Sequence, residues 1–515
     1  MTHAVTNQPP PLPDVDLGAD PAFRDAFGAD YGALGLAAGR TEARDWSEAA
    51  HRHPPRLETH DRFGHRIDRV AFHPAYHDLM RLGIEGGVSA SAWTGEGHRG
   101  HAARLFLMAQ ADPGVVCPMS MTYAAVPALR AAPDLAATWV PRVAAAAYDP
   151  RTVPAAAKDG VTLGMAMTEK QGGSDVRANL TRAVPDGAAW RLTGHKWFCS
   201  APMSDGFLTL AQADGGLTCF LVPRWLEDGA NAIRLVRLKE KMGDRSNASA
   251  EIEYEGALAH RVGPEGRGIA TIIAMVQGTR LSCVAGSAAG MRAALREAAW
   301  HAAHRTAFQR KLIDQPAMRA VLADLALEVE AAMALLGRAA AAMDAEEPLA
   351  RVLVPAAKFW VCKRHVGVAH EAMEAMGGNG YVEAGPMPRL FRQSPLNAIW
   401  EGSGNVIALD LLRVLAREPE AVAALDDLLG RLPRDGAAGA HAAGLRDRLQ
   451  PGAVDEGGAR RFAEDLGLAL QFDALADGPF ADAFAAARLG ARGLSHGTVP
   501  LPEAELLARA MPVPA

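Results

Sequence analysis

The segment N397-A-I-W-E-G-S-G-N-V406 places one carboxylate, Glu401, on a glycine-flanked turn that is followed by an apolar stretch with helical spacing. Gly402 and Gly404 allow the backbone to adopt a positive φ and to approach a ligand closely. This combination favours a general base. A loop carboxylate is also commonly exposed to solvent without any catalytic role, so this segment alone leaves both interpretations open.

A second turn-forming segment lies far upstream, in M165-A-M-T-E-K-Q-G-G-S-D-V176. Thr168 and Ser174 supply small hydroxyl groups, and backbone N–H groups in such a loop can donate to an anionic oxygen. A plain β-turn uses the same residue types. The segment therefore indicates either a ligand loop or an ordinary turn.

Composition sets the broad class of protein. The chain has 515 residues, of which 49% are hydrophobic and 22% are charged, and this length predicts roughly three domains or more. The formal net charge of −6 provides no global field that would attract nucleic acid or an anionic membrane. The five cysteines, at positions 117, 199, 219, 283 and 362, are widely spaced and predict free thiols in a reducing compartment.

The N-terminal segment M1-T-H-A-V-T-N-Q-P-P-P-L-P13 carries prolines where a signal peptide needs an apolar core. No uninterrupted apolar run reaches membrane-spanning length. We therefore expect a cytoplasmic protein with no membrane partner, in which residues 1–20 form an extended arm.

The period of the hydrophobic pattern changes twice along the chain. Helical spacing over residues 21–160 gives way to period two over 161–262, where A250-E-I-E-Y-E255 places Ile252 and Tyr254 on one face of a strand. Helical spacing then returns. The predicted fold class is α+β, with an N-terminal arm (1–20), an N-terminal helical domain (21–160), a middle antiparallel β domain (161–262), a C-terminal helical bundle (263–417) and an additional helical domain (418–515).

Six motifs occur in order along these domains: T168-E-K-Q-G-G-S-D-V176, G194-H-K-W-F-C-S200, K241-M-G-D-R-S-N247, R305-T-A-F-Q-R-K-L312, M376-G-G-N-G-Y381 and W400-E-G-S-G-N405. With this order of domains, the chain resembles the acyl-CoA dehydrogenase family. Within that family it is similar to the AidB-like branch, which is associated with the bacterial adaptive response to DNA alkylation. The resemblance runs from about residue 50 to 415.

The resemblance implies FAD as the cofactor. Arg305 and Phe308 match family positions that reach the flavin of a neighbouring subunit, which implies a homotetramer built as a dimer of dimers. The residues that the resemblance assigns to the cofactor are Met167, Thr168, Gly173, Ser174, Trp197, Phe198, Ser200, Arg305, Phe308, Gly377, Gly378, Trp400, Gly402, Ser403 and Asn405.

The resemblance also implies the reaction, an α,β-dehydrogenation of a short or branched acyl-CoA. Glu401 would take the α-proton while flavin N5 accepts the β-hydrogen as hydride, and a base of this kind needs withdrawal from water, so we expect Glu401 to be buried beside Trp400. Some family members place the base on an earlier helix. The matching position here is Thr279, which is not an acid, and its neighbour Arg280 is expected to pair with a buried acid or a backbone carbonyl.

Other chemistries have weaker support. His301 and His304 stand at i, i+3 without a readable third ligand, so no metal site is predicted. No G-x-G-x-x-G opens a βαβ unit and no P-loop is present. A nicotinamide enzyme or an NTPase is therefore disfavoured.

A competing function is a DNA-associated protective flavoprotein with little or no dehydrogenase activity, because AidB-like proteins carry a C-terminal extension credited with binding double-stranded DNA. Residues 416–515 contain ten arginines, no lysine and fifteen acids, a formal balance of −5. Such a module must gather its arginines on one face to bind phosphates. The candidates are Arg413, Arg431, Arg434, Arg446 and Arg448, with Arg460 and Arg461. Ion pairing of these arginines with Asp447, Glu464 and Asp465 is the alternative.

Overall fold

The computed structural model describes residues 4–28, 31–490 and 493–515. Its contacts divide the chain into two compact units, one formed by residues 1–41 and 280–515 and the other by residues 42–279. The division falls inside one long helix, α8 (Gly268–His304). The five segments predicted from the sequence are a finer division than these two units, and their boundaries stay predictions.

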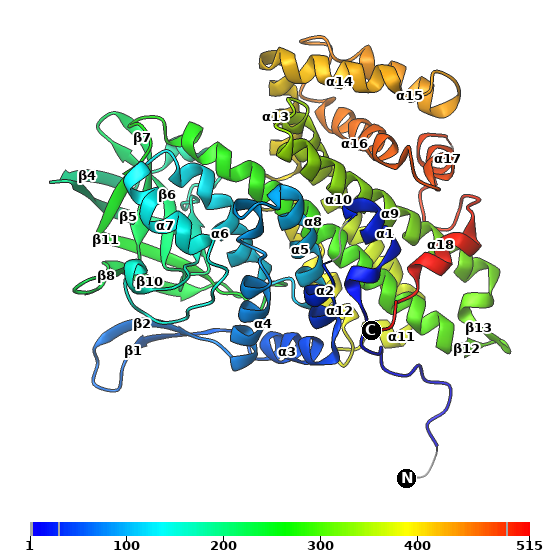
Figure 1. Cartoon of the computed structure of the whole chain (residues 1–515), viewed down its shortest axis with the longest axis horizontal. Coiled ribbons are helices and arrows are strands. Elements are labelled where there is room, and N and C mark those ends of the chain that lie inside the picture. The colour runs from blue at the N-terminus through cyan, green and yellow to red at the C-terminus, as the bar shows by residue number, and fades with distance from the viewer. Residues whose placement is uncertain (1–3, 29–30, 491–492) are drawn as a thin grey trace. The chain divides into compact units, whose positions relative to one another are not determined.

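The unit of residues 42–279 is mixed helix and sheet (Figure 1). Its helices, with short 3-10 turns, are α3 (Thr41–Arg52), α4 (Pro74–Glu85), η2 (Ser91–Trp93), α5 (Gly97–Ala111), α6 (Val116–Leu129), α7 (Pro133–Val143), η3 (Ala155–Ala157) and η4 (Val176–Ala178). Its strands are β1 (Arg56–His60), β2 (Arg66–Ala71), β3 (Leu163–Ala166), β4 (Arg182–Asp186), β5 (Ala189–Ser200), β6 (Gly206–Ala213), β7 (Gly216–Pro223), β8 (Trp225–Leu226), β9 (Gly229–Ala230), β10 (Ile233–Leu238) and β11 (Ser249–Val262).

Seven strands form one sheet in the order β10-β11-β5-β4-β6-β3, with β7 joined to both β11 and β6. Ile252 and Tyr254 of β11 are buried in its core, as the period-two pattern predicted. Most pairings are antiparallel, but β3 and β4 each pair with β6 in parallel. The expectation of an antiparallel domain is thus correct for most of the sheet and wrong for these two pairings.

The hairpin of β1 and β2 was not expected, because its sequence lies in the stretch assigned to helices. Every residue of β1 is at least partly exposed, so the strand lacks the apolar alternation that would have revealed it. Asp61 makes the turn by accepting hydrogen bonds from the N–H groups of Phe63 and His65.

The unit of residues 1–41 and 280–515 is mainly helical. Its elements are η1 (Leu17–Ala19), α1 (Pro21–Phe27), α2 (Gly32–Gly39), β12 (Thr306–Ala307), β13 (Arg310–Lys311), η5 (Leu312–Asp314), α9 (Pro316–Asp344), α10 (Ala350–Ala375), α11 (Gly378–Tyr381), α12 (Met387–Gln393), η6 (Leu396–Ala398), α13 (Gly404–Arg417), α14 (Pro419–Arg431), α15 (Gly436–Arg446), α16 (Ala459–Leu475), α17 (Ala481–Phe484), a π-helical turn η7 (Ala485–Gly490) and α18 (Glu503–Ala510).

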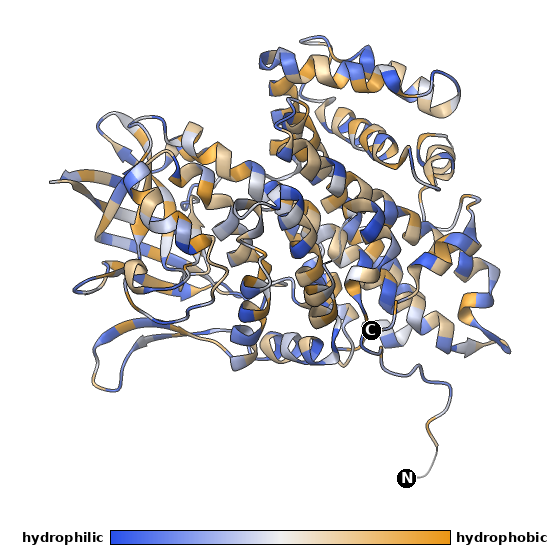
Figure 2. Cartoon of the chain, viewed as in Figure 1, coloured by the Kyte–Doolittle hydropathy of each residue, from blue (hydrophilic) through white to orange (hydrophobic). Residues whose placement is uncertain are grey.

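Helices α9, α10 and α16 pack against one another in this unit. The apolar stripe of α9 is buried and consists of Leu322, Leu325, Val329, Met333 and Leu336. The outer helices α14 and α15 carry hydrophobic and hydrophilic residues on the same helix, the amphipathic pattern of a helix that packs on one side only (Figure 2). The stretch after residue 418 is therefore helical, as expected.

Helix α8 is long and apolar enough to cross a membrane by length and composition alone. The core helix of a soluble protein passes the same test, and 61% of the most apolar window of α8 is buried inside the protein. This is weak evidence for a membrane span.

Candidate active site

Glu401 lies in the turn between η6 and α13, with a backbone φ of +56°. A positive φ is uncommon for a residue other than glycine and persists only where the surroundings hold it. Gly402 follows with a φ of +101°, and a Cβ atom there would lie 3.0 Å from Ile407 Cδ1. The Glu401 side chain is partly exposed. The chain's own residues therefore do not provide the burial that was expected for the base.

Two cations hold the backbone of this turn. The Lys358 ammonium, on α10, is only 1% exposed and donates to the carbonyl oxygens of Trp400, at 2.8 Å, and of Gly402. Arg280 Nε donates to the carbonyl oxygen of Glu401 itself, at 3.4 Å. Three consecutive carbonyl groups are thus fixed by charged donors, which form stronger hydrogen bonds than neutral ones.

Arg280 is itself fixed by Asp410 of α13, through a contact of 2.8 Å. Asp410 also accepts from Arg351, at 2.9 Å, and from Arg413, at 3.2 Å. Burial opposes ionisation of Asp410, but the hydrogen bond from Arg351 and the charge of Arg280 outweigh it, so the pKa of Asp410 lies below its ordinary value. The expected pairing of Arg280 with a buried acid and a carbonyl is confirmed.

The residues before Glu401 are tied to helix α8. Trp400 Nε1 donates to Asn397 Oδ1 at 2.8 Å, and Asn397 Nδ2 in turn donates to Ser287 Oγ at 3.1 Å. Both ends of the turn are therefore anchored to the helical bundle, which limits how far the Glu401 backbone can move.

The first turn of α13 is electropositive. A Cβ atom on Gly404 would lie 2.8 Å from Lys363 Nζ and 3.2 Å from Arg460 Nη1. Arg460 also donates to Asn405 Oδ1 at 2.7 Å. Burial, with the nearby charge of Arg460, lowers the pKa of Lys363. A helix N-terminus favours anions, and the two cations strengthen that preference.

Two further predicted cofactor segments lie in the same unit. Gly377 has a φ of +59°, and added Cβ atoms on Gly377 or Gly378 would meet nothing within 4 Å, so a ligand can approach this backbone. Arg305 donates to the carbonyl oxygen of Asn7 in the N-terminal arm. Phe308, at the tip of the β12–β13 hairpin, is 91% exposed.

The other predicted cofactor residues belong to the unit of residues 42–279, where a buried ion pair supports their loop. Glu169 and Lys196 are fully buried with a contact of 2.8 Å, and Glu169 also accepts from the N–H groups of Leu180 and Thr181. Burial opposes ionisation of Glu169, but the hydrogen bond from Lys196 lowers its pKa overall. Glu169 therefore supports the loop as a structural acid.

The loop is joined to strand β5 by a hydrogen bond of 2.8 Å from Trp197 N to the carbonyl oxygen of Thr168. A Cβ atom on Gly173 would lie 2.4 Å from Thr168 Oγ1, so any larger residue there would displace the Thr168 side chain. The structure therefore brings the segment from Met167 to Ser174 together with the segment from Trp197 to Ser200.

Strand β5 bulges at Trp197 and Phe198. Its pairing with β11 shifts there, because Lys196 faces Ile252 while Cys199 faces Ala250, so two residues of β5 oppose one of β11. Such bulges redirect side chains and are frequent beside active sites. Phe198 is exposed, and the ammonium of Lys239 covers the Trp197 ring at 3.5 Å from the centroid.

Comparison with known proteins assigns the family. The model of the AidB N-terminal domain matches residues 7–150, and those of the acyl-CoA dehydrogenase middle and C-terminal domains match 164–257 and 266–416. The putative acyl-CoA dehydrogenase AidB of Escherichia coli strain K12 is 46% identical over 440 residues, which cover 81% of each chain. The chain belongs to the acyl-CoA dehydrogenase family, in its AidB-like branch.

A sequence match and a structure match from Caenorhabditis elegans agree with this assignment. Acyl-CoA dehydrogenase family member 11 is 34% identical over 409 residues, which cover 73% of this chain and 65% of the worm protein. The crystal structure of ACDH-11 in complex with C11-CoA matches with a TM-score of 0.85 and 27% identity, and covers 99% of this chain and 93% of that one. Members of the acyl-CoA dehydrogenase family are FAD-dependent oxidoreductases, and FAD is the cofactor of this AidB-like chain.

The residues present fit FAD. The electropositive first turn of α13, with Lys363 and Arg460, suits an anionic part of the dinucleotide. Gly402, Ser403 and Asn405, which the resemblance assigns to the cofactor, lie in this turn or directly before it. Ser403 makes no capping bond with its own helix. In the other unit, the small hydroxyls of Thr168 and Ser200 and the bulge at Trp197 offer polar and aromatic groups of the kind that bind a flavin ring.

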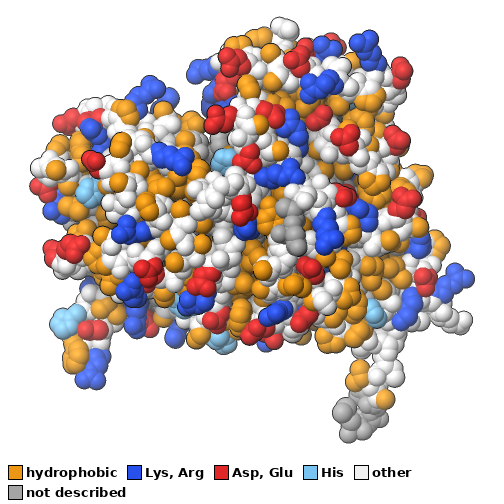
Figure 3. Space-filling view, viewed as in Figure 1, with side chains coloured by type: hydrophobic (Ala, Val, Ile, Leu, Met, Phe, Trp, Pro, Cys, Tyr) orange, Lys and Arg blue, Asp and Glu red, His pale blue; other side chains and the backbone are white. Residues whose placement is uncertain are grey.

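The arginines considered for DNA binding in this AidB-like protein are mostly paired with acids. Arg446 pairs with Asp426 at 2.6 Å, and Asp465 accepts from both Arg448, at 3.1 Å, and Arg461, at 2.9 Å. Arg413 contacts Asp410, and Arg460 donates a hydrogen bond to Asn405 Oδ1. Arg431 and Arg434 are exposed. Over the face that Figure 3 shows, basic and acidic side chains alternate and do not form a continuous basic surface.

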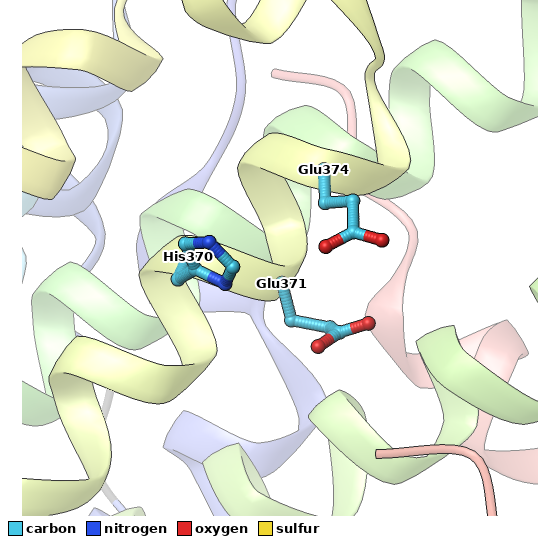
Figure 4. Close-up of side chains that lie close together, drawn as sticks. All are labelled: His370, Glu371 and Glu374. Atoms are coloured by element: carbon cyan, nitrogen blue, oxygen red, sulfur yellow. The ribbon is translucent and has the colours of Figure 1, made fainter. Parts of the chain in front are cut away.

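One group of potential metal ligands occurs among the described residues, on α10. His370, Glu371 and Glu374 offer ligand atoms within 4.8 Å of one another (Figure 4). His370 and Glu374 are exposed, and such groups are common at surfaces without an ion, so we assign no metal site to them. His301, one of the two histidines at i, i+3 on α8, is buried.

Sequence analysis missed Lys358, Lys363 and Arg460 as members of this site. All three cations act on the backbone or on the first turn of α13, and no motif marks a lysine that binds carbonyl groups. The sequence did contain one signal for Lys358. A surface lysine on a helix often pairs with an acid four residues away, but Val354 and Cys362 occupy those positions around Lys358.

Proposed function

We propose that the protein catalyses FAD-dependent α,β-dehydrogenation of a short or branched acyl-CoA, with Glu401 as the base. The observation that carries this proposal is the fixed, positive-φ turn at Glu401, whose flanking carbonyls are held by Lys358 and whose own carbonyl is held by Arg280. Such strain, held by buried charged donors, is typical of a functional residue. The remaining partial exposure of the carboxylate leaves it accessible to a substrate.

In this reaction the Glu401 carboxylate removes the α-proton of the thioester. The bound flavin supplies an acceptor for the β-hydrogen, which leaves as hydride. Negative charge develops on the thioester oxygen and needs preorganised donors. The family resemblance gives that role to the backbone N–H of Glu401, and the fixed turn supports it, since a mobile donor would have to be reoriented in the transition state.

A panel of acyl-CoA substrates determines the preferred chain length of the acyl group. The worm relative ACDH-11 was crystallised with C11-CoA, so a panel should include butyryl-, isovaleryl- and undecanoyl-CoA. Anaerobic addition to the purified holoprotein should bleach the flavin absorption with at least one of them. Bleaching by none of the panel would overturn the proposed reaction.

The second candidate, a DNA-associated protective flavoprotein of the alkylation response, draws on the similarity to AidB and on the exposed Arg431 and Arg434. The pairing of Arg446, Arg448 and Arg461 with acids weakens it, because paired arginines have less to gain from phosphates. A gel shift with double-stranded DNA over a salt series separates the two functions. A steep loss of affinity with salt supports DNA binding, and no shift at low salt removes it.

We further propose a cytoplasmic homotetramer. Phe308 protrudes at a φ of +50° and is 91% exposed, which suits a residue that inserts into a neighbouring copy. All five cysteines are free and buried, in keeping with a reducing compartment. Light scattering coupled to gel filtration tests the assembly, with a monomer as the contradicting result.

A further inference from the structure

A partly enclosed cleft of about 210 Å³ lies in the unit of residues 42–279, and its lining includes none of the residues predicted to hold FAD or to act as base. Helix α4, the end of strand β2, the first turn of α6, the segment around Tyr148 and the loop after β5 all contribute to its wall. These segments are far apart in the sequence. The cleft is therefore a product of the fold and not of one local turn.

Aromatic side chains form one part of the wall of the cleft. Phe72 and Tyr76 stack with their ring centroids 3.9 Å apart and their planes 13° apart. Tyr148 faces His77, with 2.7 Å between its hydroxyl oxygen and His77 Nδ1. Met80 and Met203 belong to the apolar part of the wall, and methionine side chains contact aromatic rings favourably. These surfaces suit a flat apolar molecule.

The formal charges around the cleft cancel. Lys158 pairs with Asp205 at 2.6 Å, Asp149 pairs with Arg151 at 2.9 Å, and Arg69 pairs with Glu58 at 2.7 Å. Burial lowers the pKa of His77, which keeps this imidazole neutral at pH 7. A charged ligand would lose its hydration here without gaining an unpaired partner, so the cleft favours an uncharged one.

One polar group in the wall lacks a partner. Ser204 is 3% exposed, and its hydroxyl oxygen makes no hydrogen bond to any of the described residues. A buried hydroxyl without a hydrogen bond is unfavourable. A ligand with a hydrogen-bonding atom near Ser204 would remove that penalty.

We propose that this cleft binds a small, uncharged molecule with one aromatic ring and one hydrogen-bonding group, of the phenol class, whose polar group pairs with Ser204. The size agrees, because a cavity of about 150 Å³ holds benzene and the cleft is larger by the volume of a small substituent. The ring lies against the aromatic wall formed by Phe72, Tyr76 and Tyr148. This site is independent of the proposed dehydrogenase reaction.

Fluorine NMR on the holoprotein with three probes tests the proposal. The probes are 4-fluorophenol, fluorobenzene, which lacks the hydroxyl group, and 4-fluorobenzoate, which is charged. We expect saturable binding of 4-fluorophenol, binding at least about fivefold weaker for fluorobenzene, and no saturable binding of the benzoate. Equal binding of all three probes, or no binding of 4-fluorophenol up to its solubility limit, would overturn the proposal.

Matched variants locate the binding site. Ser204→Ala removes the unpartnered hydroxyl and should weaken 4-fluorophenol binding at least about fivefold, while Met203→Trp fills the cleft and should abolish it. Ser91→Ala is the control, because Ser91 is equally buried with an unpartnered hydroxyl and does not line the cleft. Glu401→Gln should leave binding unchanged. Loss of binding in Ser91→Ala or Glu401→Gln, or its persistence in folded Ser204→Ala, would refute the assignment to this cleft.

Discussion

The ammonium group of Lys358 lies 2.8 Å from the carbonyl oxygen of Trp400, the residue that precedes Glu401. Lys358 also donates to the carbonyl oxygen of Gly402, so it spans the turn on both sides of the proposed base. A buried lysine usually pairs with a carboxylate. Here backbone carbonyls take that place, which makes Lys358 a positioning residue for Glu401.

Lys358→Met should leave the fold and the bound FAD in place but lower the rate of flavin reduction at least about 10-fold, because the Glu401 backbone loses its fixed geometry. The loss should appear in kcat more than in KM. Rapid-mixing absorbance measures it, with FAD content checked from the spectrum. Lys311→Met is a control of the same chemistry, since Lys311 also donates to a backbone carbonyl oxygen, that of His304, at 2.9 Å. A variant with unchanged kcat would mean that the contacts of Lys358 only stabilise the bundle.

Gly402→Ala should reduce the free energy of unfolding by about 1–2 kcal/mol, because a φ of +101° is strained for alanine and the added Cβ meets Ile407. Gly378→Ala provides the comparison, since no atom lies within 4 Å of its added Cβ. It should change stability by less than about 0.5 kcal/mol. It should still weaken FAD binding if this backbone approaches the cofactor. Chemical denaturation of the apoprotein and flavin titration measure the two effects separately.

Glu328 makes stability depend on acid pH. It is buried between Arg364 and Arg488, and although burial opposes its ionisation, these two arginines lower its pKa from 4.5 to about 2. The ionised Glu328 carboxylate stabilises the folded state fully above pH 4.5, and this stabilisation is lost as the pH falls from 4.5 towards 2. It amounts to about 3 kcal/mol for a shift of this size.

Glu328→Gln should therefore destabilise the protein by about 3–5 kcal/mol at pH 7, because it removes a buried carboxylate from two partly buried guanidinium groups. The same substitution should flatten the pH dependence of the unfolding free energy between pH 5 and 3. Glu383→Gln serves as the control, because its pair with Arg392 is exposed at the glutamate, and should cost less than about 1 kcal/mol. Equal effects of the two substitutions would contradict the assigned pKa shift.

If the protein binds double-stranded DNA, exposed and paired arginines should contribute differently. The double variant Arg431→Gln, Arg434→Gln should weaken binding and reduce the slope of log affinity against log salt by about 2, since each phosphate contact contributes about 0.9. Arg446→Gln, which loses the pair with Asp426, should change the slope by less than about 0.5. Identical slopes for all three proteins would exclude a role for Arg431 and Arg434.

The sequence predicted the order of helical and sheet regions because periodicity is local. Ile252 and Tyr254 reveal their strand through alternation within six residues. The contacts that fix the site are not local. Lys358 lies more than forty residues before the carbonyls that it binds, and the bulge at Trp197 depends on the register of β11. Among the arginine pairs of the last hundred residues, the pairing of Arg448 and Arg461 with Asp465 was an alternative that the sequence offered. The pair of Arg446 with Asp426 was not foreseen, because these residues meet across two helices.

The central claim is that Glu401 removes the proton that starts the reaction. The most direct measurement is the anaerobic rate of flavin reduction by the best acyl-CoA, compared between the parent protein, Glu401→Gln and Glu169→Gln, each with its FAD content matched. We expect the loss in Glu401→Gln to reach about 10³-fold or more, while Glu169→Gln, if it folds and retains FAD, stays within about 10-fold of the parent. Flavin reduction by Glu401→Gln at a rate close to that of the parent protein would contradict the account.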